Sequence, residues 1–209
     1  RSSDLDPFDR APSDPGTVKQ SLDIEPLAPM VLFVGSLEYR KGPDLLLEAA
    51  PAVLEGKPDA RFVFVGDGQL RAHLEKEGDR FCIQQAVRFV GWRPFDDLIA
   101  LYRSCDLVCA PSRTEPFGIV PLSAWAAGKP VVAGRIGGAT EPILDGTNGF
   151  RVSLNPEAVA AAILRLFEDF DHLRWMGRNG RVAAETAFTW DTVARQTLDA
   201  YARSRRIQT

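Results

Sequence analysis

Hydrophobic residues follow two patterns along this chain. Short apolar runs of strand length recur, several of them ended by glycine, as expected for strands buried on both faces of a sheet. They predict strands at residues 30–35, 61–66, 87–90, 107–110, 130–133 and 150–152. Between and after these runs, apolar residues recur with the period of an amphipathic helix. They predict helices at residues 43–54, 70–76, 95–104, 117–127, 157–170, 172–186 and 190–205.

Alternating strands and helices predict an α/β fold, a Rossmann-like parallel sheet flanked by helices. We expect one doubly wound domain over residues 29–209. Residues 1–28 mix aspartate with proline and glycine, which predicts a linker or extended segment, or else a disordered tail. Pro51 should kink or weaken the first long helix. Ligands of such sheets bind beyond the carboxyl ends of the strands, so the turns after the strands are the candidate sites.

Composition narrows the function classes. The 209 residues carry 25 Lys and Arg against 28 Asp and Glu, a net charge of −3, which gives no support to a nucleic-acid partner. No apolar run approaches the roughly 18 residues of a transmembrane segment. Three cysteines without nearby histidines favour a reducing compartment and no metal site. The chain begins with Arg1, so we expect a fragment or a processed product.

Two turns after predicted strands could hold a phosphate or a nucleoside. The first starts at Gly35-Ser36 and ends with Arg40 and Lys41, a pair of cations just before a predicted helix. A helix N-terminus favours anions, although such pairs are more often solvated surface charges. The second turn, Gly66-Asp67-Gly68, would let a nucleotide approach the backbone, or it is simply a tight turn.

The turn after the fourth predicted strand carries the most chemistry. Glu115 lies just before a predicted helix that Gly118 opens, so the amides of Gly118, Ile119 and Val120 are candidates to hold an anion. A carboxylate beside such amides suits a polyhydroxylated ligand attached to phosphate. The alternative is that Glu115 only caps the helix.

Taken together, these motifs resemble the C-terminal domain of family-4 retaining glycosyltransferases, which share the GT-B fold of two facing Rossmann-like domains. The resemblance covers residues 29–206, and Asp4 to Phe8 is similar to the segment that follows the family's N-terminal domain. The motifs that carry it are Gly35…Lys41-Gly42, Gly66-Asp67-Gly68, Phe89-Val90-Gly91, Pro111-Ser112…Glu115-Pro116-Phe117-Gly118, Ala127-Gly128-Lys129-Pro130 and Gly137-Gly138…Glu141…Asp145-Gly146…Gly149.

The resemblance implies a domain that binds a nucleotide-sugar donor without a metal. Lys41 and Glu115 would be the catalytic residues, one on the donor phosphates and the other on the hydroxyls of the donor sugar. The amides of residues 118–120 would hold the phosphates, and residues 66–68 with Arg93 would line the nucleoside pocket. The acceptor site would belong to an absent N-terminal domain, so this chain alone should bind donor weakly and transfer little. The family resemblance also implies a cytoplasmic enzyme of glycan biosynthesis, with any membrane association in the other domain.

Two positions depart from the family. Ser36 stands where the family usually has arginine, which removes a phosphate cation that Arg40 or Arg135 would have to replace. Ser123 stands where the second glutamate of the E-x7-E signature holds the nucleotide ribose, although the related starch and glycogen synthases also lack glutamate there. The alternatives are therefore a non-catalytic nucleotide-sugar-binding or interaction module, and a nucleotide-sugar epimerase. We also expect the last helix to keep part of its apolar stripe without partners.

Overall fold

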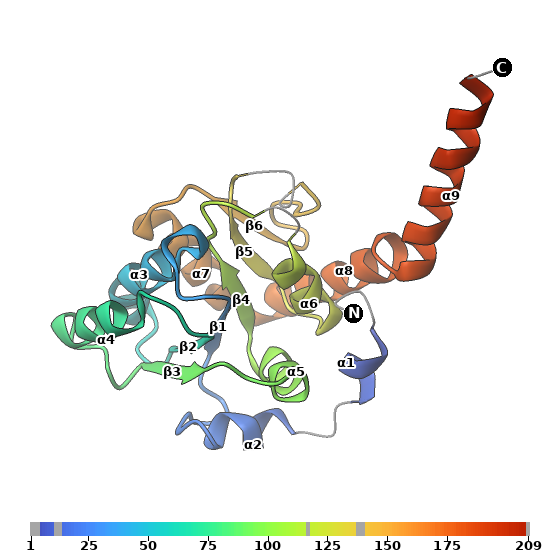
Figure 1. Ribbon diagram of the computed structural model, residues 1–209. Coiled ribbons are helices and arrows are strands. Elements are labelled where there is room, and N and C mark those ends of the chain that lie inside the picture. Colours follow the sequence, from blue (N-terminus) through green and yellow to red (C-terminus); the bar gives the residue numbers. More distant parts are fainter. Residues whose placement is uncertain (1–4, 11–13, 116–117, 137–140, 208–209) are drawn as a thin grey trace.

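Six parallel strands form a single sheet in the order β3-β2-β1-β4-β5-β6 (Figure 1). The computed structural model describes residues 5–10, 14–115, 118–136 and 141–207. The order confirms the predicted Rossmann-like class, because the chain winds outward in one direction from β1 and in the other from β4. The strands are β1 Met30–Val34, β2 Arg61–Val65, β3 Val87–Gly91, β4 Leu107–Ala110, β5 Val131–Gly134 and β6 Gly149–Val152.

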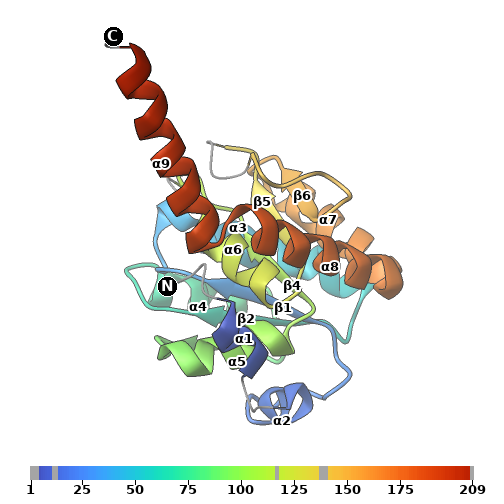
Figure 2. The same cartoon turned by 90° about the vertical axis from the view of Figure 1, so that its right-hand side faces the viewer.

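Helices cover both faces of the sheet, which explains why the strands are apolar throughout. One hydrophobic cluster joins the sheet to α3, α4 and α7, and the other joins it to α1, α5 and α6 (Figures 1 and 2). The described helices are α1 Asp6–Arg10, α2 Pro15–Gln20, α3 Pro43–Gly56, α4 Arg71–Arg80, α5 Phe95–Ser104, α6 Ile119–Ala126, α7 Pro156–Glu168, α8 Phe170–Ala187 and α9 Trp190–Ile207, with a 3-10 turn η1 at Tyr39–Lys41.

Several helix boundaries differ from the prediction, among them those of α3, α4 and α6. Helix α3 continues through Pro51 to Gly56, because it packs against α7 along its length and both lie in the same core cluster. Helix α4 runs four residues beyond its predicted end, to Arg80, where the apolar pattern gave no signal. Helix α6 begins at Ile119, because Gly118 has a left-handed backbone with φ 74°. The predicted helix residue Phe117 lies outside the described residues, as do Pro116, Gly137 and Gly138.

The prediction of an extended segment over residues 1–28 is wrong in two places. Residues 6–10 and 15–20 are helical, and the side chains of Phe8 and Ile24 are almost completely buried in the core. Asp14 caps α2 by accepting a hydrogen bond from the Thr17 amide at 2.9 Å, so here aspartate and proline start a helix. The division into residues 1–28 and 29–209 stays a prediction.

Helix α9 projects away from the rest of the molecule, as both ribbon views show (Figures 1 and 2). Its side chains Trp190 and Leu198 are each at least 60% exposed, as expected for an apolar stripe that the rest of the domain leaves partly uncovered. Over the described ranges, no helix combines the length and the apolar character that crossing a bilayer requires.

Candidate functional site

The turns after β1 and β4 meet at the carboxyl edge of the sheet. The Arg40 carbonyl accepts hydrogen bonds from the amides of Arg113 and Thr114, at 2.8 and 3.2 Å. Gly42 lets the two turns approach this closely: its φ is 70°, and a Cβ there would lie 2.2 Å from the Pro111 carbonyl oxygen. The two candidate phosphate turns are therefore one continuous surface.

Lys41 and Glu115 form an ion pair where the two turns meet. The Lys41 Nζ lies 2.6 Å from Glu115 Oε2, and both side chains are about four-fifths buried, at 17% and 16% exposure. The other carboxylate oxygen, Oε1, accepts a hydrogen bond from the Gly118 amide at 3.2 Å. The Gly118 amide, predicted to be open for an anion, is thus occupied by Glu115, which also makes the capping alternative correct in part.

Arg113 stabilises the loop that carries Glu115. Its guanidinium makes a two-pronged ion pair with Asp44, at 2.8 and 2.6 Å, and donates to the Tyr39 carbonyl at 2.7 Å. The hydrogen bond that Arg113 donates to Asp44 raises the pKa of Arg113 above its ordinary value. Because Asp44 lies in the first turn of α3, Arg113 fixes the loop that carries Glu115 against the start of that helix.

An apolar cavity of about 380 Å³ lies over the ends of β1, β2 and β3. Lys41 is next to its wall, because the Lys41 Cγ lies 3.8 Å from the position that a Cβ on Gly35 would take. Gly66 shapes it: its φ is 128°, and a Cβ there would lie 2.0 Å from the Gly35 carbonyl oxygen. Small-molecule sites commonly have volumes of roughly 300–1,000 Å³. We call this space the apolar cavity, and it is lined by Val34, Gly35, Ser36, Val65, Gly66, Asp67, Trp92, Arg93 and Leu98.

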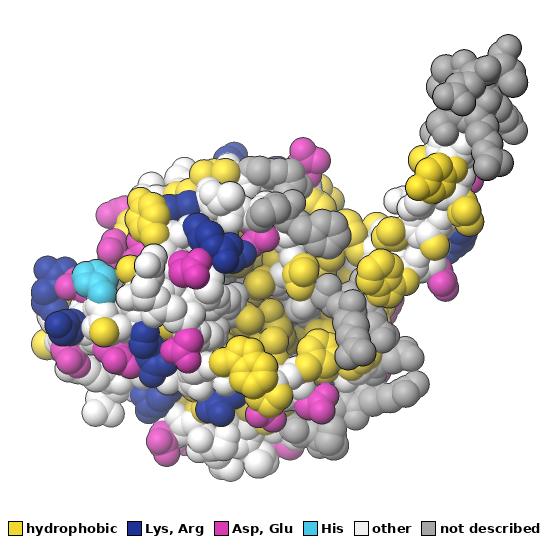
Figure 3. Space-filling model, in the orientation of Figure 1, with side chains coloured by type: hydrophobic (Ala, Val, Ile, Leu, Met, Phe, Trp, Pro, Cys, Tyr) yellow, Lys and Arg dark blue, Asp and Glu magenta, His cyan; other side chains and the backbone are white. Residues whose placement is uncertain are grey.

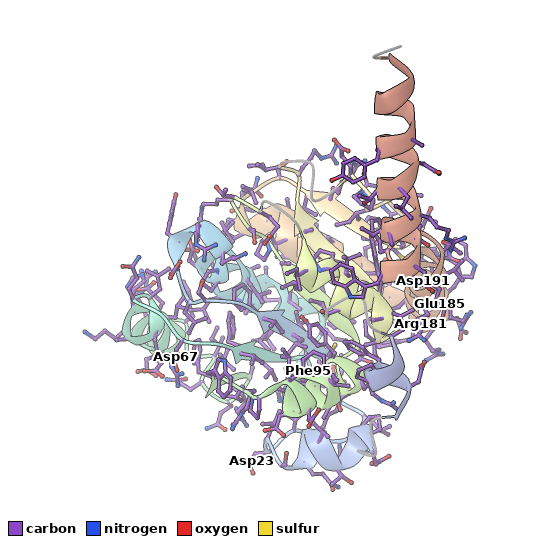
Figure 4. The ribbon with its side chains drawn as sticks, turned by 45° about the vertical axis from the view of Figure 1, so that its right-hand side comes forward. Asp23, Asp67, Phe95, Arg181, Glu185 and Asp191 are labelled. Atoms are coloured by element: carbon purple, nitrogen blue, oxygen red, sulfur yellow. The ribbon has the colours of Figure 1, made fainter. Side chains whose placement is uncertain are left out.

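The rim of the apolar cavity exposes large hydrophobic side chains. Trp92 is 73% exposed and Phe95 is 43% exposed. Hydrophobic side chains gather on the face shown in Figure 3, and Figure 4 labels Phe95 at the start of α5 and Asp67 in the turn after β2. An exposed aromatic ring at a cavity mouth offers a flat surface on which a planar ring can stack.

The structure brings most of the predicted residues together. Gly35, Ser36, Asp67 and Arg93 line the apolar cavity, and Gly68 packs against the Leu37 backbone at the same edge. The Arg40 Nη2 lies 3.3 Å from Ser36 Oγ, so Arg40 stands beside the position that lacks the family's arginine. Ile119 and Val120 occupy the first turn of α6, whose amides have no acceptor within the helix.

Two of the predicted site residues, Ser123 and Arg135, do not line the apolar cavity. Ser123 is buried at 7% exposure, and its hydroxyl hydrogen-bonds the side chain of Tyr102. Burial raises the pKa of Tyr102 well above its ordinary value, while the Ser123 bond opposes that shift. Arg135 donates to the Arg151 carbonyl at 2.9 Å, beside β6, so Arg40 is the better placed of the two candidate replacement cations.

Sequence reasoning missed two contributors, Arg113 and Trp92. The partner of Arg113 is 69 positions away, and no local pattern links it to Asp44. Trp92 could have been predicted, because it is an aromatic residue directly after Gly91, the glycine that ends β3. In the sequence analysis this position led only to Arg93.

Comparison with known proteins agrees with this geometry. The family profile described as "Glycosyl transferases group 1" matches residues 16–183. A D-inositol 3-phosphate glycosyltransferase of Segniliparus rotundus is 36% identical over 196 residues, which are 91% of this chain and 43% of that protein. A glycogen synthase of Mycobacterium tuberculosis is 34% identical over 179 residues, 84% of this chain and 43% of the relative. The chain spans slightly less than half the length of these relatives.

Among solved structures, the Anabaena protein HepE in complex with UDP superposes with a TM-score of 0.86 and 28% identity. The match covers 96% of this chain and 55% of HepE. HepE has also been solved with UDP-glucose, with a TM-score of 0.85 to this chain.

Proposed function

The chain belongs to the group 1 glycosyltransferases, and on that premise we propose that it is the donor-binding domain of a retaining enzyme. Such an enzyme transfers a hexosyl group from a nucleotide sugar to an acceptor hydroxyl. The acceptor attacks the anomeric carbon on the face from which the diphosphate leaves, so one carbon–oxygen bond breaks as another forms. UDP-glucose is the first donor to test, because it occupies the solved relative HepE.

One observation carries this proposal: a cation and a carboxylate meet directly beside a cavity of nucleoside size. The Lys41 Nζ and the Glu115 carboxylate are 2.6 Å apart. In a nucleotide sugar, the terminal phosphate and the sugar are bonded neighbours, so their recognition groups must also be neighbours. The apolar cavity of about 380 Å³ then takes the nucleoside, with Trp92 and Arg93 at its wall.

Donor binding changes the partners of Lys41. Its ammonium group leaves Glu115 for the diphosphate, and the first-turn amides of Ile119 and Val120 add to the positive end of α6. Charge that develops on the departing diphosphate is stabilised at this point without a metal. The Gly118 amide keeps Glu115 Oε1 in place, so Oε2 can accept hydrogen bonds from hydroxyls of the donor sugar.

We further propose that a second, N-terminal domain supplies the acceptor site. Exposed apolar side chains on α9 support this, with Trp190 60% exposed and Leu198 67% exposed. The 209-residue chain alone should then bind donor but transfer no sugar. We place the complete enzyme in the cytoplasm, in glycan biosynthesis, with any membrane association in the other domain.

The test has a binding part and a turnover part. Calorimetry of this chain with UDP, GDP, ADP and their glucose conjugates should give measurable binding to at least one of them. In the two-domain enzyme, Glu115→Gln should reduce turnover more than it weakens binding of the bare diphosphate. NMR of the product gives the configuration at the anomeric carbon. No binding by the whole panel would contradict the donor-domain assignment, and an inverted product would contradict retention.

A further inference from the structure

A second cavity, of about 420 Å³, lies at the opposite end of the sheet, between β6 and α7. We call it the arginine cavity, because Arg135, Arg151 and Arg165 line it together with Asp145 and the apolar wall of Phe150 and Ala162. The apolar cavity lies over β1 to β3, whereas β6 is three strands from β1. At about 4.8 Å per strand, the two sites are roughly 14 Å or more apart.

We propose that the arginine cavity binds a small phosphomonoester. Its three guanidinium groups and one carboxylate leave a local charge of +2, in a chain whose net charge is −3. A phosphomonoester carries about −1.5 to −2 charges at pH 7, which matches this excess. Guanidinium groups also present paired donors that fit phosphate oxygens.

Asp145 does not satisfy the arginines that surround it. Its Oδ2 lies 3.8 Å from Arg135 Nη2 and 3.6 Å from Arg151 Nη2, both longer than a hydrogen bond. Its Oδ1 instead accepts from the Arg151 backbone amide at 2.6 Å. The backbone therefore fixes this carboxylate. The Arg135 Nη2 donates to the Arg151 carbonyl, and the other donors of the two guanidinium groups remain for a ligand.

A second, independent sign of a ligand comes from the Arg151 Nε. This nitrogen is inaccessible to solvent, and within the described residues it has no hydrogen-bond partner. Buried donors without an acceptor are rare in folded proteins, and an unseen ion or ligand is one common explanation. After a small shift of the side chain, a phosphate oxygen in the cavity would supply the acceptor.

The apolar wall indicates that the ligand is larger than inorganic phosphate. The Arg165 guanidinium lies over the Phe150 ring, 4.9 Å from its centroid, and the described part of the chain places no carboxylate within ion-pair distance of it. The exposed Ala161, with the edges of Phe150 and Ala162 that are each 8% exposed, forms an apolar surface that phosphate alone would not cover. An ester whose organic group packs on this wall uses both halves of the cavity.

Calorimetry at low salt tests the proposal with phenyl phosphate, glycerol 3-phosphate and inorganic phosphate as probes. Phenyl phosphate should bind most tightly, and Arg165→Ala should weaken it roughly 10- to 100-fold, the effect of losing one charge-assisted hydrogen bond. Arg165 is exposed on α7, so this variant should fold. The matched control is Arg178→Ala on α8, which lines neither the arginine cavity nor the apolar cavity and should leave the affinity unchanged.

A competition experiment separates this site from the donor site. Saturating UDP should leave the affinity for phenyl phosphate unchanged, because the cavities are separate. Competition by UDP, an equal loss in Arg178→Ala, or no probe binding tighter than about 1 mM would each overturn the proposal. The arginine variants give their answer whether or not the chain binds nucleotide sugars, so failure here is distinct from failure of the proposed function.

Discussion

The two cavities lie against the same sheet, but backbone forms one of them and side chains form the other. Backbone forms the apolar cavity: Gly35 and Gly66 remove side chains where two turns touch, and the charged pair Lys41–Glu115 stands beside it. Side chains form the arginine cavity, where three guanidinium groups surround the carboxylate Asp145. The first presents a mostly apolar lining to a ring, and the second concentrates positive charge.

Because the two cavities are built differently, they should respond differently to substitutions and to salt. A cavity formed by close backbone contact depends on residue size at single positions and should be insensitive to salt. A cavity formed by exposed cations tolerates size changes but should weaken as ions screen it. Mutation and salt should therefore act differently on the two cavities.

Adding one methyl group should damage the first cavity far more than the second. In Gly66→Ala the new Cβ would lie 2.0 Å from the Gly35 carbonyl oxygen at a φ of 128°, so the turn must move. We expect a loss of about 3 kcal/mol in the free energy of unfolding, measured by urea titration, from overpacking and backbone strain.

Gly146→Ala is the matched control at the arginine cavity. Gly146 also has positive φ, 75°, but among the described residues no heavy atom lies within 4 Å of the position that an added Cβ would take. The free energy of unfolding should fall only by the cost of placing alanine at a positive φ, about 1 kcal/mol. Equal losses in the two variants would show that close backbone contact does not distinguish the cavities.

Removing an aromatic ring should affect nucleoside binding alone. Trp92→Ala should weaken uridine binding by about 1 kcal/mol, or roughly fivefold, since it removes an exposed stacking surface at the apolar cavity. Trp175→Ala on α8, where the ring is 42% exposed and stacks on His172, is the control and should bind uridine normally. Unchanged uridine affinity in Trp92→Ala would remove the ring from the site.

Salt should separate the two cavities without any mutation. Raising the ionic strength from about 0.01 M to about 1 M shortens the Debye length from about 30 Å to about 3 Å. Phenyl phosphate binding at the arginine cavity should weaken severalfold over this range, while uridine binding at the apolar cavity stays nearly constant. A salt-sensitive uridine titration would contradict the apolar assignment.

The reactivity of the three thiols should respond least to any ligand. Burial raises the pKa of Cys105 from 9.0 to about 12 and that of Cys109 further, whereas Cys82 is exposed. Only Cys82 should react with a thiol reagent at neutral pH, with or without ligand.

The raised thiol pKa also sets a pH dependence. A thiol that stays protonated in the folded chain but ionises in the unfolded chain contributes stability that is intact below about pH 9 and is lost as the pH rises toward 12. Unfolding midpoints measured across this range should fall. Reaction of Cys105 in the native protein at neutral pH would contradict the burial.

The sequence was sufficient to predict the strands of the sheet and the motif residues, because both depend on local patterns. Apolar runs, several of them ended by glycine, located all six strands, and the turn signals placed Lys41 and Glu115 at strand ends. Contacts between distant segments left no such signal. The Lys41–Glu115 pair joins positions 74 apart, and Arg113–Asp44 joins positions 69 apart. Helices α1 and α2 were missed because their stability comes from packing Phe8 and capping by Asp14, which local propensity does not report.

The most direct test of the donor site is calorimetry of UDP and uridine with three proteins: the wild type, Lys41→Ala and Lys57→Ala. Lys57 is the control cation, since its ion pair with Asp59 lies at the far end of α3. We predict that Lys41→Ala weakens UDP binding by about 1.5–3 kcal/mol, roughly 10- to 100-fold, and leaves uridine binding unchanged. Lys57→Ala should match the wild type for both ligands. UDP binding to Lys41→Ala as tight as to the wild type would contradict the account.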